Sequence, residues 1–303
     1  MSARFILSLD CEGKWGVADV LTAHEHRSLT EARLRSAYAS ILALLDEFDV
    51  PASFAFVGLF GESRQSMQQL EPEIEALAKR APAYLRPALN DMREGSREGW
   101  DGAWAVESVA QARAGHEIAL HGITHVPWGT VDAKFASDEL ALLPLLRPPV
   151  RQSRTFVYPR NDVAHVELLA PAGLVGYRLS APRRSRAMSL ASEFAILSPP
   201  EQDRAMSGGV YPIPAGYFVN WQHGLRRCVP RSVSRLRARQ MLLRAERSQY
   251  LVHYWLHPEN LASEPGTLDN LRDIVAMAAR MRDAGRCEIL TQLAYCERRC
   301  GET

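Results

Sequence analysis

Short apolar runs alternate with longer amphipathic segments along this 303-residue chain, and the alternation limits the folds open to it. Apolar runs that fit buried strands lie at 4–10, 52–57, 116–120, 154–158, 174–179, 210–214, 250–256 and 286–291. Helical spacing of apolar residues lies between them, at 29–48, 66–80, 104–114, 134–146, 163–170, 231–247 and 267–284. About six or seven β–α alternations predict an α/β fold, either a parallel barrel or a doubly wound sheet.

The length of the chain indicates one domain. An α/β barrel typically has about 250 residues, so 303 residues correspond to a barrel with insertions. Residues 82–103 are rich in Pro, Gly, Asp and Trp and are predicted to form a long loop, and 181–209 are predicted to be irregular. No repeat or linker divides the chain, and we expect a single domain over 1–303.

Charge and composition exclude several classes of partner. The formal net charge is +1, so no overall field recruits nucleic acid or an anionic membrane. No apolar stretch approaches the ~18 residues of a membrane span, and the run at 5–9 is too short for a signal peptide. Five cysteines without a CxxC pair indicate free thiols. We therefore expect a cytoplasmic protein; the sequence does not determine its oligomeric state.

Two carboxylates stand at the end of the first predicted strand, where an apolar run meets Asp10, Cys11 and Glu12. The carboxyl ends of parallel strands are where α/β proteins build active sites. Because side chains alternate along a strand, Asp10 and Glu12 share a face and Cys11 points away. This spacing suits one metal-ligating carboxylate beside one base. An acid pair that caps a helix or pairs with arginine is the alternative.

Two histidines, His121 and His125, follow the strand predicted at 116–120. One local turn would bring their imidazoles together. Two imidazoles and one carboxylate make a site typical of zinc-like ions, with positions open for water and substrate. Two histidines in a surface loop are the alternative. The neighbouring His116-Glu117 pair is no zinc-protease motif, because HExxH would need a histidine at Leu120.

A third histidine, His257, ends the strand predicted at 250–256 and is a candidate general acid. His253 has the same parity but lies deeper, where we expect a packed and hydrogen-bonded imidazole. Other chemistries lack their motifs, since there is no GxSxG elbow and no GxGxxG or Walker loop.

Candidates for substrate contacts lie after the fourth strand and in the predicted loop. Tyr158, Arg160 and Asn161 close the run at 154–158, and a salt bridge or a helix cap would explain the last two equally well. Trp100 and Asp101 lie in the loop at 82–103. An exposed aromatic side chain there would suit stacking on a sugar ring, and a hydrophobic plug is the alternative.

Taken in order, these motifs resemble those of the polysaccharide deacetylase (NodB homology) superfamily. The resemblance rests on residues 8–13, on 115–125 with His121 and His125, on Phe156 and Pro159, and on 256–258. It implies a distorted (β/α)7 TIM-like barrel with long loop insertions. It also implies a carbohydrate deacetylase that uses one divalent metal ion, with zinc expected first and cobalt, nickel or manganese as alternatives.

The resemblance assigns a role to each residue of the site. Asp10 would be the general base, His257 the acid, and Glu12, His121 and His125 the metal ligands. The family's usual pair of adjacent aspartates is absent, because Cys11 separates Asp10 from Glu12, and the chain resembles a D-x-E variant subgroup. The arginine-proline motif of the fourth strand is also altered, since Arg160 follows Pro159.

The expected function is removal of an acetyl group from an N-acetylated sugar in the biosynthesis of a cell-surface polysaccharide such as O-antigen. A cytoplasmic enzyme would meet this sugar as a nucleotide-linked or lipid-linked precursor, or as a growing glycan. One alternative is a C–N hydrolase of the same fold that acts on a ureide or cyclic amide. Another is a catalytically inactive, carbohydrate-binding barrel.

Overall fold

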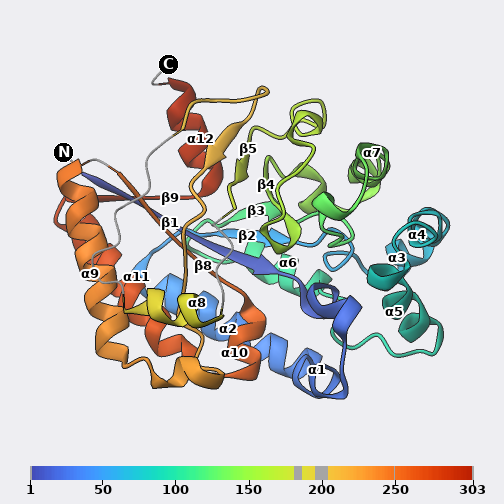
Figure 1. Cartoon of the computed structure of the whole chain (residues 1–303), viewed down its shortest axis with the longest axis horizontal. Coiled ribbons are helices and arrows are strands. Elements are labelled where there is room, and N and C mark those ends of the chain that lie inside the picture. Colours follow the sequence, from blue (N-terminus) through green and yellow to red (C-terminus); the bar gives the residue numbers. More distant parts are fainter. Residues whose placement is uncertain (1, 181–185, 195–203, 249, 302–303) are drawn as a thin grey trace.

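The computed structural model describes residues 2–180, 186–194, 204–248 and 250–301, and its strands form one parallel sheet (Figure 1). The strands are β1 (Ala3–Cys11), β2 (Ser53–Phe56), β3 (Glu117–Leu120), β4 (Thr155–Val157), β5 (Gly176–Arg178), β6 (Tyr211–Ile213), β7 (Tyr217–Phe218), β8 (Leu251–Leu256) and β9 (Cys287–Leu290). Their order is β6-β5-β4-β3-β2-β1-β8-β7, and β9 pairs with the beginning of β1.

One interrupted stretch of chain links the two ends of this sheet. β6 pairs with β5, and β7, which follows after Pro214, Ala215 and Gly216, pairs with β8. The stretch from β6 to β7 therefore takes the place of one interrupted strand that closes the barrel between β5 and β8. The predicted distorted (β/α)7 barrel is confirmed, with β9 added beside β1.

The register of the strands brings the predicted site residues to one end of the barrel. Cys11 is paired with Phe56, and Phe56 with Leu120. Leu9 is paired with Leu256 on the other side of β1. The residues that follow these pairs therefore lie at the same carboxyl-terminal edge, and they include the candidate ligands and the candidate acid.

Alternate residues of β1 serve two different cores. Phe5, Leu7, Leu9 and Cys11 belong to the large core beneath the surrounding helices. Ile6 belongs to a smaller cluster of apolar side chains, and Ser8 and Asp10 share its parity. Cys11 therefore faces away from Asp10, as the alternation of side chains predicts.

Twelve α-helices of the described residues surround the sheet. They are α1 (Ala23–Ser28), α2 (Glu31–Phe48), α3 (Arg64–Gln69), α4 (Glu71–Ala78), α5 (Pro82–Arg93), α6 (Ala103–Ala110), α7 (Ala133–Leu140), α8 (Arg186–Glu193), α9 (Arg231–Ser248), α10 (Pro258–Ser263), α11 (Thr267–Asp283) and α12 (Gln292–Gly301). In Figure 1, α9, α11, α2 and α10 lie toward the left and bottom of the view, and α3, α4 and α5 lie at its right. Within the described part of the chain, no helix is both long and apolar enough to cross a bilayer.

Three segments differ from the sequence prediction. Residues 82–93 form α5 instead of a loop, because Pro82 occupies the first turn, where proline is tolerated, and Leu85, Ala88 and Leu89 supply a buried face. The helix predicted at 163–170 is reduced to one 3-10 turn, Val166–Leu168. Within 181–209, residues 186–193 are helical, and 181–185 and 195–203 lie outside the described residues.

The buried histidine His253 should make the fold sensitive to mild acid. Ser8 lies 2.8 Å from its Nε2, and Nδ1 lies 2.7 Å from the Pro214 carbonyl oxygen. Burial lowers the pKa of His253 to about 3, whereas an unfolded histidine titrates near 6.5. Below pH ~6.5 the unfolded chain binds a proton at this histidine and the folded chain does not. The free energy of unfolding therefore decreases by about 1.4 kcal/mol for each unit by which the pH is lowered.

We expect His253→Gln to remove most of this slope. From pH 7 to pH 5, chemical denaturation should show a wild-type loss about 2 kcal/mol larger than that of the variant. His24→Gln is the matched control, because His24 is exposed, and its pH dependence should follow the wild type. Parallel curves for the wild type and His253→Gln would contradict the prediction.

Candidate active site

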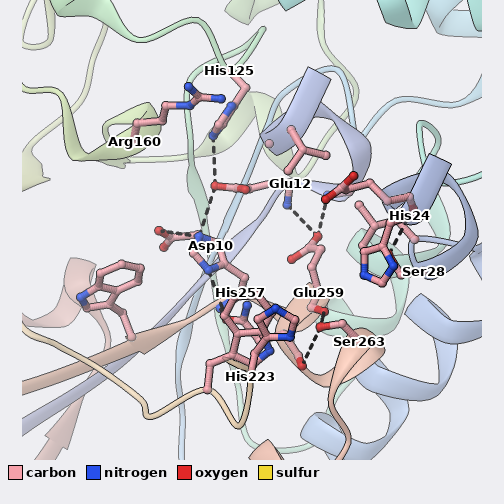
Figure 2. A pocket seen from close by; sticks show the side chains of 18 of the residues that line it. Asp10, Glu12, His24, Ser28, His125, Arg160, His223, His257, Glu259 and Ser263 are labelled. Carbon is pink, nitrogen blue, oxygen red and sulfur yellow. Dashed lines mark hydrogen bonds and ion pairs between the residues drawn. The ribbon is translucent and has the colours of Figure 1, made fainter. Parts of the chain in front are cut away.

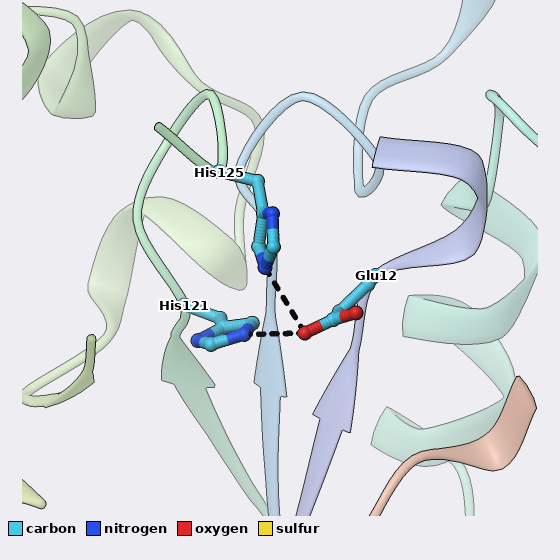
Figure 3. Close-up of side chains that lie close together, drawn as sticks. All are labelled: Glu12, His121 and His125. Atoms are coloured by element: carbon cyan, nitrogen blue, oxygen red, sulfur yellow. Dashed lines mark hydrogen bonds and ion pairs between the residues drawn. The ribbon is translucent and has the colours of Figure 1, made fainter. Parts of the chain in front are cut away.

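The end of β1 and the loop after β3 bring one carboxylate next to two imidazoles (Figure 3). Glu12 Oε1 lies 2.8 Å from Nε2 of His121 and 3.0 Å from Nε2 of His125. Both imidazoles are buried, and one candidate ligand atom from each residue lies within 4.8 Å of the others. The structure thus places together the three side chains that the sequence suggests as metal ligands.

The hydrogen bonds of His121 indicate that a cation belongs in this cluster. Its Nδ1 lies 2.8 Å from the Val157 carbonyl oxygen, which can only accept, so Nδ1 carries the hydrogen. In the neutral ring, Nε2 then presents a lone pair to a carboxylate oxygen. Two acceptors at 2.8 Å need a proton or a metal ion between them. The donor set of two imidazoles and one carboxylate fits a zinc-like ion.

The protonation states in the cluster also suit metal binding. Burial lowers the pKa of His125, which favours the neutral, ligating imidazole. Burial alone would raise the pKa of Glu12, but the nearby His125 and His257 and its close contacts with His121 and His125 hold that pKa well below its usual range. Glu12 is therefore ionised at neutral pH.

A glycine gives the Glu12 side chain its room. Gly16 lies in the 3-10 helix Gly13–Val20 that follows β1. A Cβ atom at Gly16 would lie 1.9 Å from Glu12 Oε2. Any larger residue would displace the carboxylate, so this turn is shaped around it.

Asp10 is held by an arginine that the sequence analysis did not single out. Nη1 and Nη2 of Arg178, at the end of β5, donate to Oδ1 and Oδ2 of Asp10 at 2.7 and 2.5 Å. Both side chains are almost fully buried. Burial raises the pKa of Asp10, but Arg178 and the neighbouring histidines lower it more, and the net pKa lies below its usual value. A lone arginine at the end of a buried strand was the available signal, because such a charge must find a partner.

His257 lies on the other side of both acids. Its Nε2 is 3.9 Å from Asp10 Oδ2 and 3.4 Å from Glu12 Oε1. Its Nδ1 lies 3.3 Å from the Oδ1 of Asn260. Burial lowers the pKa of His257, but Glu12 and Asp10 raise it more, to about 9. The imidazole is protonated at neutral pH, as a proton donor requires.

A second residue missed in the sequence is Glu259. Its Oε1 accepts the backbone N–H groups of Glu12 and Gly13 at 3.1 and 2.5 Å, which holds the turn that carries Glu12. Burial and the nearby Glu12 raise its pKa to about 7. Nothing in the single sequence linked Glu259 to a turn almost 250 residues earlier.

Asp10, Glu12, His125, His257 and Glu259 line a 410 Å³ pocket (Figure 2). His125 and Arg160 lie on one side of Glu12, and His257 and Glu259 on the other. His24, Ser28 and Trp221 also line the pocket. Arg160 lines the pocket and forms an ion pair with Asp19, so the salt-bridge alternative is present, and its contact with a substrate stays a prediction.

Comparison with known proteins identifies the fold. No protein-family profile and no curated protein matches the sequence. A solved structure assigned to a polysaccharide deacetylase from Mycobacterium smegmatis matches 99% of the chain, with 91% of that protein covered, a TM-score of 0.63 and 16% identity. One from Pseudomonas aeruginosa PAO1 matches 97%, with 89% covered, a TM-score of 0.53 and 10% identity. The chain has the polysaccharide deacetylase fold.

The same fold also carries another reaction. PuuE allantoinase matches 97% of the chain, with 89% of that protein covered, a TM-score of 0.53 and 11% identity. Identities this low establish the fold alone. The reaction has to be inferred from the site.

Within this polysaccharide deacetylase fold, three of the predicted substrate contacts do not line the pocket. Trp100 is fully buried, donates its Nε1–H to Asp91 at 2.8 Å and packs edge-on against Trp15. Asp101 pairs with Arg97 at 2.7 and 2.9 Å. The hydrophobic-plug alternative for Trp100 is therefore the correct one.

Tyr158 is the third of these residues. It is fully buried and packs edge-on against Phe156 and Trp128. Its place at the end of β4 made it a candidate, but its side chain belongs to the core beneath the helices.

Proposed function

We propose that this chain is a metal-dependent deacetylase of the NodB homology superfamily, in a D-x-E variant subgroup, that removes the acetyl group from an N-acetylated sugar. The observation that carries the proposal is Glu12 Oε1 at 2.8 and 3.0 Å from two imidazole nitrogens, beside a buried carboxylate and a protonated histidine. These are the parts that hydrolysis of an amide requires.

In this proposal Glu12, His121 and His125 hold one divalent ion, with zinc first and cobalt, nickel or manganese as alternatives. When bound, such an ion supplies Lewis-acid polarisation of the acyl carbonyl and a water of lowered pKa. Asp10, ionised and fixed by Arg178, accepts the proton of the attacking water. His257 donates its Nε2 proton to the nitrogen as the C–N bond breaks, which releases an amine and acetate.

The substrate class is the finer part of the proposal. We infer an N-acetylated sugar of cell-surface polysaccharide biosynthesis, such as an O-antigen precursor linked to a nucleotide or a lipid. The pocket lining supports a sugar, because it includes Trp221, which stacks on His223. It also includes Ser28 and Ser263, whose hydroxyl groups donate to backbone carbonyls and keep lone pairs for a ligand. Pockets of this size commonly combine apolar surface with a few polar groups that orient a ligand.

The rival reaction is hydrolysis of a ureide or cyclic amide, and the similarity to an allantoinase supports it. An inactive, sugar-binding barrel is disfavoured, since the residues proposed as acid, base and metal ligands lie close together.

Purified protein, stripped with a chelator and reloaded with zinc, tests the reaction. We expect acetate release from an N-acetylglucosamine oligomer or from UDP-N-acetylglucosamine, its loss with the chelator and its return with zinc or cobalt. Opening of allantoin without acetate release would favour the rival. Sugar binding with neither product would indicate the inactive barrel.

A further inference from the structure

A turn with an unusual backbone places Asn161 at the pocket. Asn161 follows Arg160 after β4, and both residues have positive φ, at 53° and 55°. Asparagine tolerates this left-handed conformation better than most residues. The Asn161 N–H bonds the Tyr158 carbonyl at 2.9 Å, which closes the turn, and the residue lines the pocket.

Arg178 determines which way the Asn161 amide faces. Nη2 of Arg178 lies 2.9 Å from Oδ1 of Asn161. A guanidinium group only donates hydrogen bonds, so the amide must turn its oxygen toward Arg178. The NH2 group of Asn161 therefore points away from Arg178, and among the described residues no acceptor bonds to it.

The Arg178 guanidinium that holds this amide is itself held by several hydrogen bonds. Nη1 of Arg178 donates to Asp10 and, at 3.2 Å, to Ser8, while Nη2 donates to Asp10 and Asn161. All four terminal hydrogens are therefore in use. The guanidinium also lies 4.7 Å from the ring centre of Trp255. One buried cation thus fixes both the candidate base and the amide beside it.

We propose that Nδ2 of Asn161 donates a hydrogen bond to an acceptor oxygen of the substrate's acyl group, next to Asp10. This deepens the proposed function and rests on it. The position provides N–H groups and no acceptor, so it selects a carbonyl or carboxylate oxygen. Acetate, the acyl product, is the smallest ligand with that chemistry. Asn161 contacts the substrate, and Arg178 acts as its positioning residue.

Two variants separate this role from a structural one, because both tolerate a positive φ. Asn161→Gly removes the amide, and Asn161→Asp keeps an oxygen for Arg178 but exchanges the donor for an acceptor. Acetate affinity is measured by calorimetry on zinc-loaded protein and again on metal-free protein, alongside the thermal midpoint. His24→Asp, at another residue that lines the pocket, controls for added negative charge.

If Asn161 is the donor, acetate binding weakens about tenfold or more in Asn161→Gly and further in Asn161→Asp, while Asn161→Asp keeps its thermal midpoint. The His24→Asp control should change affinity less than about threefold. Wild-type acetate affinity in Asn161→Asp would overturn the proposal, and so would a wild-type protein that binds no acetate. The readout needs no turnover, so a failed deacetylase assay would count against the proposed function and not against this donor.

Discussion

Replacing Asp10 with asparagine should reduce turnover by about 10²- to 10⁴-fold while the protein keeps its metal ion. An asparagine cannot accept the proton of the attacking water. The Glu12, His121 and His125 cluster does not include Asp10, so its ligands stay in place. Turnover and bound metal, measured on the same preparation, check the prediction.

The same variant decides between two possible ion sites. Asp10, Glu12 and His257 also lie close enough to share an ion. If the ion belonged to this second group, Asp10→Asn would lose metal along with activity. Retained metal and lost turnover would assign Asp10 as the base.

The free energy of unfolding should be measured for this variant as well, because Asp10 is bonded to the buried guanidinium of Arg178. An asparagine keeps one oxygen for Arg178 but turns N–H groups toward its other donor. We expect the free energy of unfolding to fall by up to about 3 kcal/mol. Asp101→Asn is the matched control: it also removes a carboxylate bonded to an arginine, but outside the pocket, and it should retain turnover. Normal activity in Asp10→Asn would end the assignment.

Replacing His121 with alanine should remove the metal ion itself. Changes to residues that merely support a ligand typically cost 10- to 100-fold in metal affinity, so loss of a ligand should cost about 100-fold or more. Metal content after dialysis and competition with a chelator provide the measurement. Activity should be lost in the same proportion as the metal.

The control for this variant is another histidine of the pocket. His24 lines the pocket and belongs to neither candidate ion group. His24→Ala should therefore bind one equivalent of metal with wild-type affinity. If His121→Ala bound metal as tightly as the wild type, the ligand set would be wrong, whatever happened to activity.

Much of the fold could be predicted because its signals are local. Alternation along β1 places Asp10 and Cys11 on opposite faces whatever the strand packs against. Apolar runs that end in polar residues marked the ends of β1, β3 and β8, where Glu12, His121 and His257 stand. Residues 82–93 were misread because composition favoured a loop, while the burial that makes them helical comes from distant neighbours.

The site divides in the same way. Sequence alone determined which residues stand at the strand ends and which side of β1 each faces, since backbone geometry sets both within a few residues. The tertiary structure decided that Arg178, 168 positions from Asp10, neutralises it, that Glu259 holds the turn of Glu12, and that Trp100 is buried. Charge pairing and burial depend on which distant segments meet. A single sequence does not show these tertiary contacts, because nothing local to an arginine or a tryptophan indicates which distant residues will surround it.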